Sequence, residues 1–134
     1  MLRPSRFLVC CLVASAALVS GCADHKIAIS SNESATVKPA VQHGAELFNE
    51  RCSGCHSLEP ADAFGSKPPG KVKGGERTDG PYFNVRKESR EDVLFAIRNG
   101  GFSGAIMPAN IVVGQDARDV ALFLERYAGQ RSTK

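Results

Sequence analysis

Two thiols and an imidazole stand close together near the middle of the chain, in the run Cys52-Ser53-Gly54-Cys55-His56. The C-x-x-C-H spacing is the attachment sequence of a c-type haem, because each thiol can form a thioether bond to one vinyl group of the macrocycle. A separation of three residues spans about one helical turn, and the adjacent histidine then lies where its imidazole can bind the iron. The motif therefore predicts one covalently attached haem c, held by Cys52 and Cys55, with His56 as an axial ligand.

Two other kinds of site use closely spaced cysteines. A thioredoxin-like dithiol is expected after a strand in a βαβ unit, and the sequence around the motif shows no such pattern. A zinc site would need a second pair of ligands at finger-like spacing. His25 and His43 are isolated, and the chain has no second C-x-x-C. The sequence thus favours haem over both alternatives.

A candidate for the second axial position lies downstream, in Ile106-Met107-Pro108. The chain has only two methionines, and the other is Met1, so Met107 is the one thioether left for the iron. Ligation by histidine and methionine raises the reduction potential and suits electron transfer. The alternative is a core methionine, because Met often fills gaps between apolar side chains. His43 is the rival ligand, but it lies on a predicted helix before the haem motif, where we expect an exposed side chain.

The N-terminus has the pattern of an export signal. Arg3 and Arg6 precede an apolar stretch, residues 7–19, which is shorter than the about 20 residues of a membrane-spanning helix. The stretch leads into the sequence V-S-G-C, which resembles a bacterial lipoprotein lipobox. The resemblance implies that residues 1–21 are a signal peptide, that cleavage occurs before Cys22, and that lipid is attached to the Cys22 sulfur. Ordinary signal cleavage and an uncleaved transmembrane anchor are the alternatives.

The cysteine count agrees with this interpretation. Of the five cysteines, Cys10 and Cys11 would leave with the signal peptide, and Cys22 would carry lipid. Cys52 and Cys55 would hold haem, so no free thiol remains and no disulfide is needed. We therefore expect an exported protein that is anchored to a bacterial membrane by lipid and faces the periplasm or the outside of the cell.

The mature chain is predicted to consist of a tether, one domain and a short tail. Residues 22–39 comprise the lipidated cysteine and a polar, Ser- and Ala-rich segment without periodicity. Such a segment predicts a flexible tether with a reach of roughly 20–25 Å. The alternative is that this segment packs on the domain through Ile27 and Ile29. Residues 40–129 are the predicted domain, and residues 130–134 are a polar tail.

Apolar periodicity predicts three helices in the domain, over about residues 39–51, 89–100 and 114–127. The first helix leads directly into the haem motif. At the start of the second, Ser89 is the N-cap and Asp92 supplies the reciprocal carboxylate of a capping box. Gly100-Gly101 ends that helix. No alternating strand pattern is visible, so the predicted fold class is all-α.

These features occur in the order found in class I c-type cytochromes, which the chain resembles over residues 40–128. Besides the haem motif and Met107, the residues that carry the resemblance are Gly44, Phe48, Gly80-Pro81, Ile97-Arg98-Asn99-Gly100, Pro108, Val120 and Phe123. The resemblance implies a small cytochrome c-like domain of three to four helices wrapped around one covalently bound haem.

The resemblance also implies individual roles. Gly44 would let the first and last helices cross closely, because no side chain intervenes. The backbone carbonyl of Pro81 would accept a hydrogen bond from the Nδ1–H group of His56, which fixes the tautomer of this ligand. Phe83 would lie against the haem. The chain departs from the family at Tyr82-Phe83, where Asn-Leu is expected.

Charge gives weaker indications about partners. Without Arg3 and Arg6 the formal net charge falls from +3 to +1, and two haem propionates would bring it to about −1. A basic cluster within residues 57–80 could steer the protein to an acidic partner, and the alternative is a solvated loop. Its members are Lys67, Lys71, Lys73 and Arg77. No basic stripe interleaved with aromatic residues supports nucleic-acid binding.

We therefore expect a membrane-tethered one-electron carrier rather than an enzyme. Its partners would be a redox donor and a redox acceptor protein, which it meets through small, short-lived contacts. With both axial positions filled, no small-molecule substrate would bind at the iron. One rival is an open-site haem sensor or enzyme, which requires Met107 to be off the iron. The other rival is a fixed haem subunit of a larger oxidoreductase complex.

Overall fold

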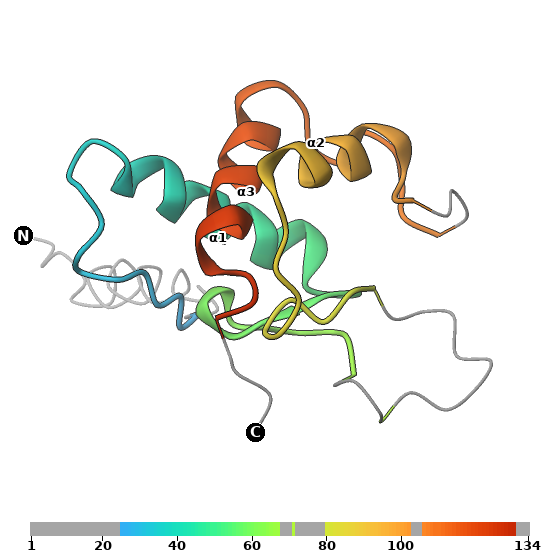
Figure 1. Cartoon of the computed structure of the whole chain (residues 1–134), viewed down its shortest axis with the longest axis horizontal. Helices are drawn as coiled ribbons and strands as arrows, with labels where there is room; N and C mark the ends of the chain where they lie inside the picture. The colour runs from blue at the N-terminus through green and yellow to red at the C-terminus, as the bar shows by residue number, and fades with distance from the viewer. Residues whose placement is uncertain (1–24, 68–70, 72–79, 103–105, 131–134) are drawn as a thin grey trace, which may run out of the picture.

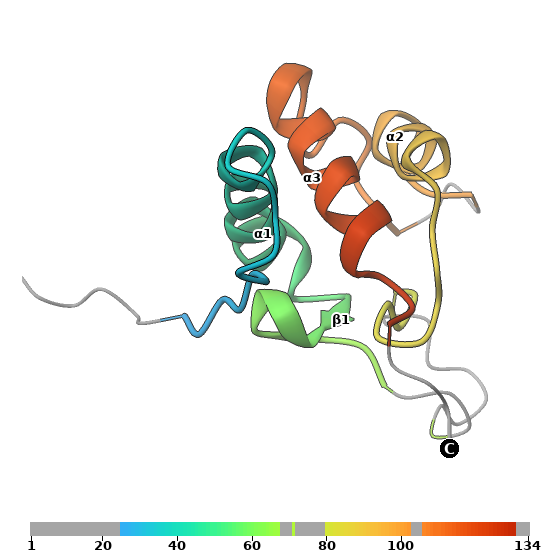
Figure 2. The same ribbon diagram turned by 60° about the vertical axis from the view of Figure 1, so that its left-hand side comes forward.

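The computed structural model describes residues 25–67, 71, 80–102 and 106–130. Its elements, in chain order, are α1 (Lys38–Cys52), β1 (Ser57–Leu58), η1 (Glu59–Ala61), β2 (Ala63–Phe64), α2 (Arg90–Asn99) and α3 (Gly114–Tyr127). The α3 helix packs against both α1 and α2, and the short segment of β1, η1 and β2 lies below them (Figures 1 and 2). Three α-helices in the described part of the chain confirm the all-α, cytochrome c-like prediction. The predicted signal peptide, Cys22, Lys73 and Arg77 lie outside the described residues.

The α1 helix presents its apolar side to α3. A proline at the start of the helix supplies a backbone that is already suited to the first turn. The buried residues recur at helical spacing, and they include Val41, Gly44, Ala45 and Phe48. Phe48 meets Phe123 of α3 with ring centroids 5.9 Å apart. Because α1 ends at Cys52, its packing on α3 fixes where the haem motif begins.

The crossing of α1 and α3 depends on Gly44. A Cβ atom at this position would lie 2.5 Å from the backbone carbonyl carbon of Asp119 and closer still to the oxygen. Backbone atoms of a packed helix cannot move aside as the end of a flexible side chain can. The two helices therefore approach as closely as only a glycine permits.

We expect Gly44→Ala to destabilise the domain by about 3 kcal/mol, at the upper end of the usual cost of overpacking, since the clash is with backbone. Denaturant unfolding followed by circular dichroism measures the change. Gly54→Ala is the matched control, because a Cβ at Gly54 would meet nothing within 4 Å. Equal stability of the two variants would contradict the close crossing.

The α2 helix begins and ends at residues with clear capping roles. The Ser89 Oγ atom accepts a hydrogen bond from the Asp92 N–H group at 3.1 Å. The Ser89 hydroxyl in turn donates a hydrogen bond to the Asp92 carboxylate at 2.7 Å, so the predicted pair of Ser89 and Asp92 forms at the start of the helix. Gly100 adopts a left-handed conformation with a φ angle of 77° and ends the helix.

A two-stranded antiparallel sheet follows the haem motif, and the sequence did not predict it. Ser57 pairs with Phe64 and Leu58 with Ala63. Each strand has only two residues, so no alternation of apolar and polar residues can reveal it. The turn between the strands is tied to α1, since the Asn49 side-chain amide donates to the Ala61 carbonyl oxygen at 2.7 Å.

Residues 25–37 differ from the flexible tether that composition predicted. Ile27 and Ile29 are partly buried against the core, as in the packed alternative. The Ala28 N–H group donates to the Pro60 carbonyl oxygen at 2.8 Å, and the Ser30 N–H group donates to the Tyr127 hydroxyl oxygen at 2.9 Å. The physical reason is that apolar side chains and backbone groups of this segment find partners on the domain.

None of the helices in the described ranges is long and apolar enough to cross a bilayer.

Candidate functional site

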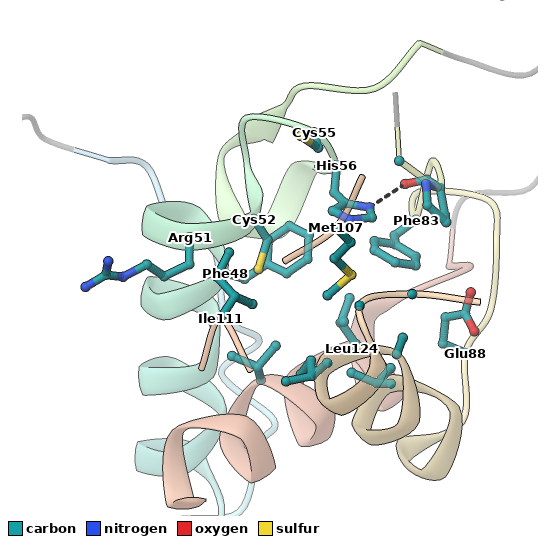
Figure 3. A pocket seen from close by; sticks show the side chains of 18 of the residues that line it. Phe48, Arg51, Cys52, Cys55, His56, Phe83, Glu88, Met107, Ile111 and Leu124 are labelled. Carbon is teal, nitrogen blue, oxygen red and sulfur yellow. Dashed lines mark hydrogen bonds between the residues drawn. The ribbon is translucent and has the colours of Figure 1, made fainter. Parts of the chain in front are cut away.

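A cavity of about 510 Å³ lies between the three helices and the segments that connect them (Figure 3). Its volume is in the range of pockets that hold a cofactor-sized molecule. Apolar side chains of α2 and α3 form part of its wall, among them Val93, Ile97, Val120 and Leu124. The other part comes from the end of α1 and from the segments before and after α2.

Cys52 and Cys55 both line this cavity, and both are free thiols. Cys52 is the last residue of α1, and the chain turns directly after it, since the Cys55 N–H group donates to the Cys52 carbonyl oxygen at 3.1 Å. Burial, together with the nearby Cys55, raises the pKa of Cys52 to about 12. A redox-active dithiol requires a cysteine whose pKa is lowered, so that the thiolate forms near neutral pH. The environment of Cys52 raises the pKa of its thiol instead of lowering it, which argues against a redox-active dithiol.

The zinc alternative finds no support in the described part of the chain. No group of three or more His, Cys, Asp or Glu side chains is placed there to hold a metal ion. The second ligand pair that a structural zinc site needs is therefore missing from the described residues.

The imidazole of His56 is held in one orientation at the cavity wall. Its Nδ1 atom lies 3.2 Å from the Pro81 carbonyl oxygen, so Nδ1–H donates this hydrogen bond and Nε2 is the nitrogen with a free lone pair. The ring stacks on Phe83, with centroids 4.9 Å apart and an interplanar angle of 17°. Burial lowers the pKa of His56, which favours the neutral imidazole that a metal requires.

Gly80 makes room for this arrangement. Its amide N–H donates to the Cys55 carbonyl oxygen at 2.7 Å, which brings the segment before Pro81 against the haem motif. A Cβ atom at Gly80 would lie 2.5 Å from His56 Nδ1, inside van der Waals contact. Any larger residue at position 80 would push the imidazole or the carbonyl of Pro81 out of place.

Met107 reaches the same cavity from the segment after α2. Its side chain is partly buried against the core, and Figure 3 shows it extending into the cavity on the side of His56. Gly100 and Gly101 shape this segment, with φ angles of 77° and 80°. A Cβ at Gly100 would lie 2.7 Å from the Met107 carbonyl oxygen, so the chain can fold back only with glycine there. The Asn110 N–H group donates to the Ile97 carbonyl oxygen at 2.7 Å and closes the loop.

The structure brings every predicted haem-binding residue to this one cavity. The lining includes Cys52, Cys55, His56, Pro81, Phe83 and Met107. Sequence reasoning did not assign the wall formed by Val93, Ile97 and Ile111. The helical spacing of Val93 and Ile97 marks a buried face, but it does not say what that face covers.

His43, the rival axial ligand, lies away from the cavity. It is on the side of α1 that faces the start of α3, where its Nδ1 atom is 2.9 Å from the Asp119 carboxylate. The His43 side chain is half-exposed, and it is not among the residues that line the cavity. The structure therefore agrees with a surface role for His43.

The His43–Asp119 pair leads to a pH prediction. The hydrogen bond to Asp119, with further attraction from Asp119, Asp116 and Glu46, raises the pKa of His43 in the folded state above its ordinary 6.5. The folded state thus binds the proton more tightly, so the stabilisation is complete below pH 6.5 and disappears as the pH rises through the folded-state pKa. We expect the difference in free energy of unfolding between wild type and His43→Gln to shrink over that window. Denaturant unfolding of both proteins at a series of pH values measures this difference. A difference that stays constant with pH would contradict a stabilising interaction between His43 and Asp119.

The comparisons with known proteins agree with the geometry. The family model for cytochrome c matches residues 41–127. The chain belongs to the cytochrome c family. Among solved structures, the crystal structure of the c-type cytochrome SorU from Sinorhizobium meliloti is similar, with 31% sequence identity and a TM-score of 0.53. The match covers 69% of this chain and 94% of SorU. No curated protein matches the chain.

Membership of the cytochrome c family assigns covalently attached haem c as the cofactor and electron transfer as the activity. The cavity fits this group in its chemistry. It offers two free thiols, an oriented imidazole with Nε2 available, and a thioether, all inside a largely apolar wall.

Proposed function

We propose that this cytochrome c is a mono-haem, class I protein that carries single electrons between redox proteins outside the cytoplasm. Cys52 and Cys55 would form the two thioether bonds. His56 and Met107 would be the axial ligands, with Pro81 and Phe83 orienting the imidazole. The observation that carries this proposal is that His56 and Met107 reach one cavity from two separate segments of the chain.

The side chains of the cavity have distinct tasks in this function. Haem c supplies a one-electron couple at its iron. The Pro81 carbonyl keeps a proton on His56 Nδ1, so the same nitrogen of the ring always faces the cavity. The soft sulfur of Met107 would favour ferrous iron and so would raise the reduction potential. The apolar wall excludes water, which limits the reorganisation that accompanies a change of charge.

Two measurements on the purified full-length protein test this function together. A redox titration should follow a one-electron curve, and gel filtration in detergent should give the size of the isolated chain with its detergent. Co-elution with other subunits at constant stoichiometry would instead make the protein a fixed part of an oxidoreductase complex.

We further propose that lipid on Cys22 anchors the protein to a bacterial membrane, as the V-S-G-C sequence and the apolar stretch before it indicate. Two or more acyl chains give firm attachment, since each buried CH₂ group contributes about 0.8 kcal/mol. Transient donor and acceptor proteins would then be met at the membrane surface.

Cys22→Ser should therefore release a soluble protein with an unchanged haem spectrum. Fractionation of cells into membrane and soluble parts, followed by haem staining, measures the release. A Cys22→Ser protein that loses its signal peptide and still sediments with membranes would show that another surface holds it there.

A further inference from the structure

Residues 25–37, which we call the strap, lie along the side of the domain that η1 and the end of α3 form. Backbone hydrogen bonds join the strap to Pro60 at Ala28 and to the Tyr127 hydroxyl at Ser30, with lengths of 2.8 and 2.9 Å. Next to these two residues, Ile27 and Ile29 are partly buried against the core. The strap therefore has apolar and backbone contacts of the kind that hold an element of a fold in place.

Charged groups fix both ends of the strap. The Arg126 guanidinium donates to the Glu33 carboxylate at 2.8 Å, and the Glu33 side chain is only 9% exposed. Near the other end, the Lys26 N–H group donates to the Asp62 carboxylate at 3.3 Å. If the strap lifts, water hydrates both charges, and the Arg126 side chain is already 42% exposed, so this ion pair fixes the position of the strap more than it stabilises it.

A docked strap leaves little free chain before it. From the Cα atom of Cys22 to that of His25 there are three residue steps, which span at most about 11 Å when fully extended. The free tether predicted from composition had twice that reach. Lipid on Cys22 would therefore hold the His25 end of the domain close to the headgroups.

The residues that line the cavity lie away from the strap. In both views the strap lies on one side of the domain and α2, with the segment that follows it, lies on the other, and α1 and α3 stand between them (Figures 1 and 2). The exposed residues of the cavity lining include Phe102 and Ile106 in that segment, at 64% and 54%, and also Arg51 and Cys55 around the end of α1. Neither the strap nor η1 contributes a residue to the lining.

We propose that the strap seats the haem domain on the membrane in one orientation, with the cavity on the side of the domain that is directed away from the lipid. The partner would then present its own redox centre from the aqueous phase, on a protein domain that stands above the membrane surface. This inference rests on the lipid anchor of the proposed function, and it adds the direction from which electrons enter and leave.

The distance between haem and lipid tests the orientation. The lipidated holoprotein is reconstituted in nanodiscs whose headgroups carry a fluorophore, and time-resolved energy transfer to the haem gives the distribution of distances. Wild type should give one narrow distribution. The variant Ile27→Ser/Ile29→Ser/Glu33→Gln, which releases the strap, should give a distribution at least twofold wider. Asn32→Ser, an exposed change within the strap, is the matched control and should resemble wild type.

Hydrogen exchange on the same nanodisc sample tests the docking independently of the lipid. The amides of Ala28 and Ser30 should be protected in wild type. Tyr127→Phe removes the acceptor of the Ser30 amide, whose exchange should become roughly tenfold faster, the factor that corresponds to one hydrogen bond.

The outcomes separate the two proposals. Two results would overturn the proposal that the strap is docked and orients the domain. One is rapid exchange of the Ala28 and Ser30 amides in wild type, and the other is a wild-type distance distribution as wide as that of the released variant. If the protein never associates with the nanodiscs, the proposed lipid anchor is wrong, and so is the orientation that depends on it. Protection of the Ala28 and Ser30 amides would still show in that case that the strap is docked on the domain.

Discussion

Replacing Met107 by alanine should open the iron to small ligands and lower the reduction potential. Under the proposed ligation, the loss of the thioether would leave the sixth position without a protein ligand, since His43 is on another side of the domain, bound to Asp119. The choice of axial ligand moves haem potentials over about 0.8 V, so we expect a fall on the order of 0.1 V. Ferric Met107→Ala protein should become partly high spin and should bind azide, and its ferrous form should bind CO.

The matched control for this experiment is His43→Ala, which should leave the visible spectrum unchanged. The two variants distinguish the possible axial ligands, because each removes one of them. A spectrum that is unchanged in Met107→Ala and altered in His43→Ala would mean ligation by two histidines, contrary to our assignment.

The double variant Cys52→Ala/Cys55→Ala should yield a chain that is largely unfolded. Both thioether bonds are lost, and a cavity of about 510 Å³ is left in the centre of the domain. The apolar side chains of its wall then lose the haem that they would pack against and are left facing water. A small domain has only about 5–15 kcal/mol of stability in total, so the loss of its central packing partner is enough to unfold it. Far-ultraviolet circular dichroism and resistance to proteolysis measure the loss of structure.

Cys22→Ser is the control for the double variant, because it also removes a thiol but leaves the cavity untouched. It should retain the helical spectrum and covalent haem. A haem-free double variant with native helix content and cooperative unfolding would show that α1, α2 and α3 pack without the cofactor.

The haem motif and the three helices could be predicted because their signals are local. The spacing of Cys52, Cys55 and His56 lies within one turn of chain, and Ser89 and Gly100 mark the two ends of α2 through interactions with their own neighbours. These signals do not depend on what packs against them. The predicted helix boundaries consequently agree with the structure to within one or two residues.

The behaviour of residues 25–37 could not be predicted in this way. The segment is polar and lacks periodicity, and the partner of Ser30 is Tyr127, 97 residues away along the chain. Whether Ile27 and Ile29 pack depends on a surface that exists only after α1, η1 and α3 have come together. Composition alone describes a segment in isolation, where it would indeed be flexible.

The choice between His43 and Met107 as the axial ligand could not be settled from the sequence either, because it also depends on contacts between distant segments. In the sequence both are candidate ligands at some distance from the motif, and only the packing of α1 on α3 turns His43 toward Asp119. The sequence also could not show that Val93 and Ile97 form part of the cavity wall. Periodicity shows that Val93 and Ile97 are buried, but α2 could cover another helix as well as a cofactor.

We propose above all that His56 and Met107 fill both axial positions, so that the protein transfers electrons and binds no substrate at the iron. The visible and near-infrared spectrum of the wild-type ferric protein, with CO added to the reduced form, tests it most directly. We predict a low-spin spectrum with the weak sulfur-to-iron charge-transfer band in the red, and no reaction with CO at neutral pH. A spectrum without this band, together with free binding of CO, would contradict the account and favour an open-site haem sensor or enzyme.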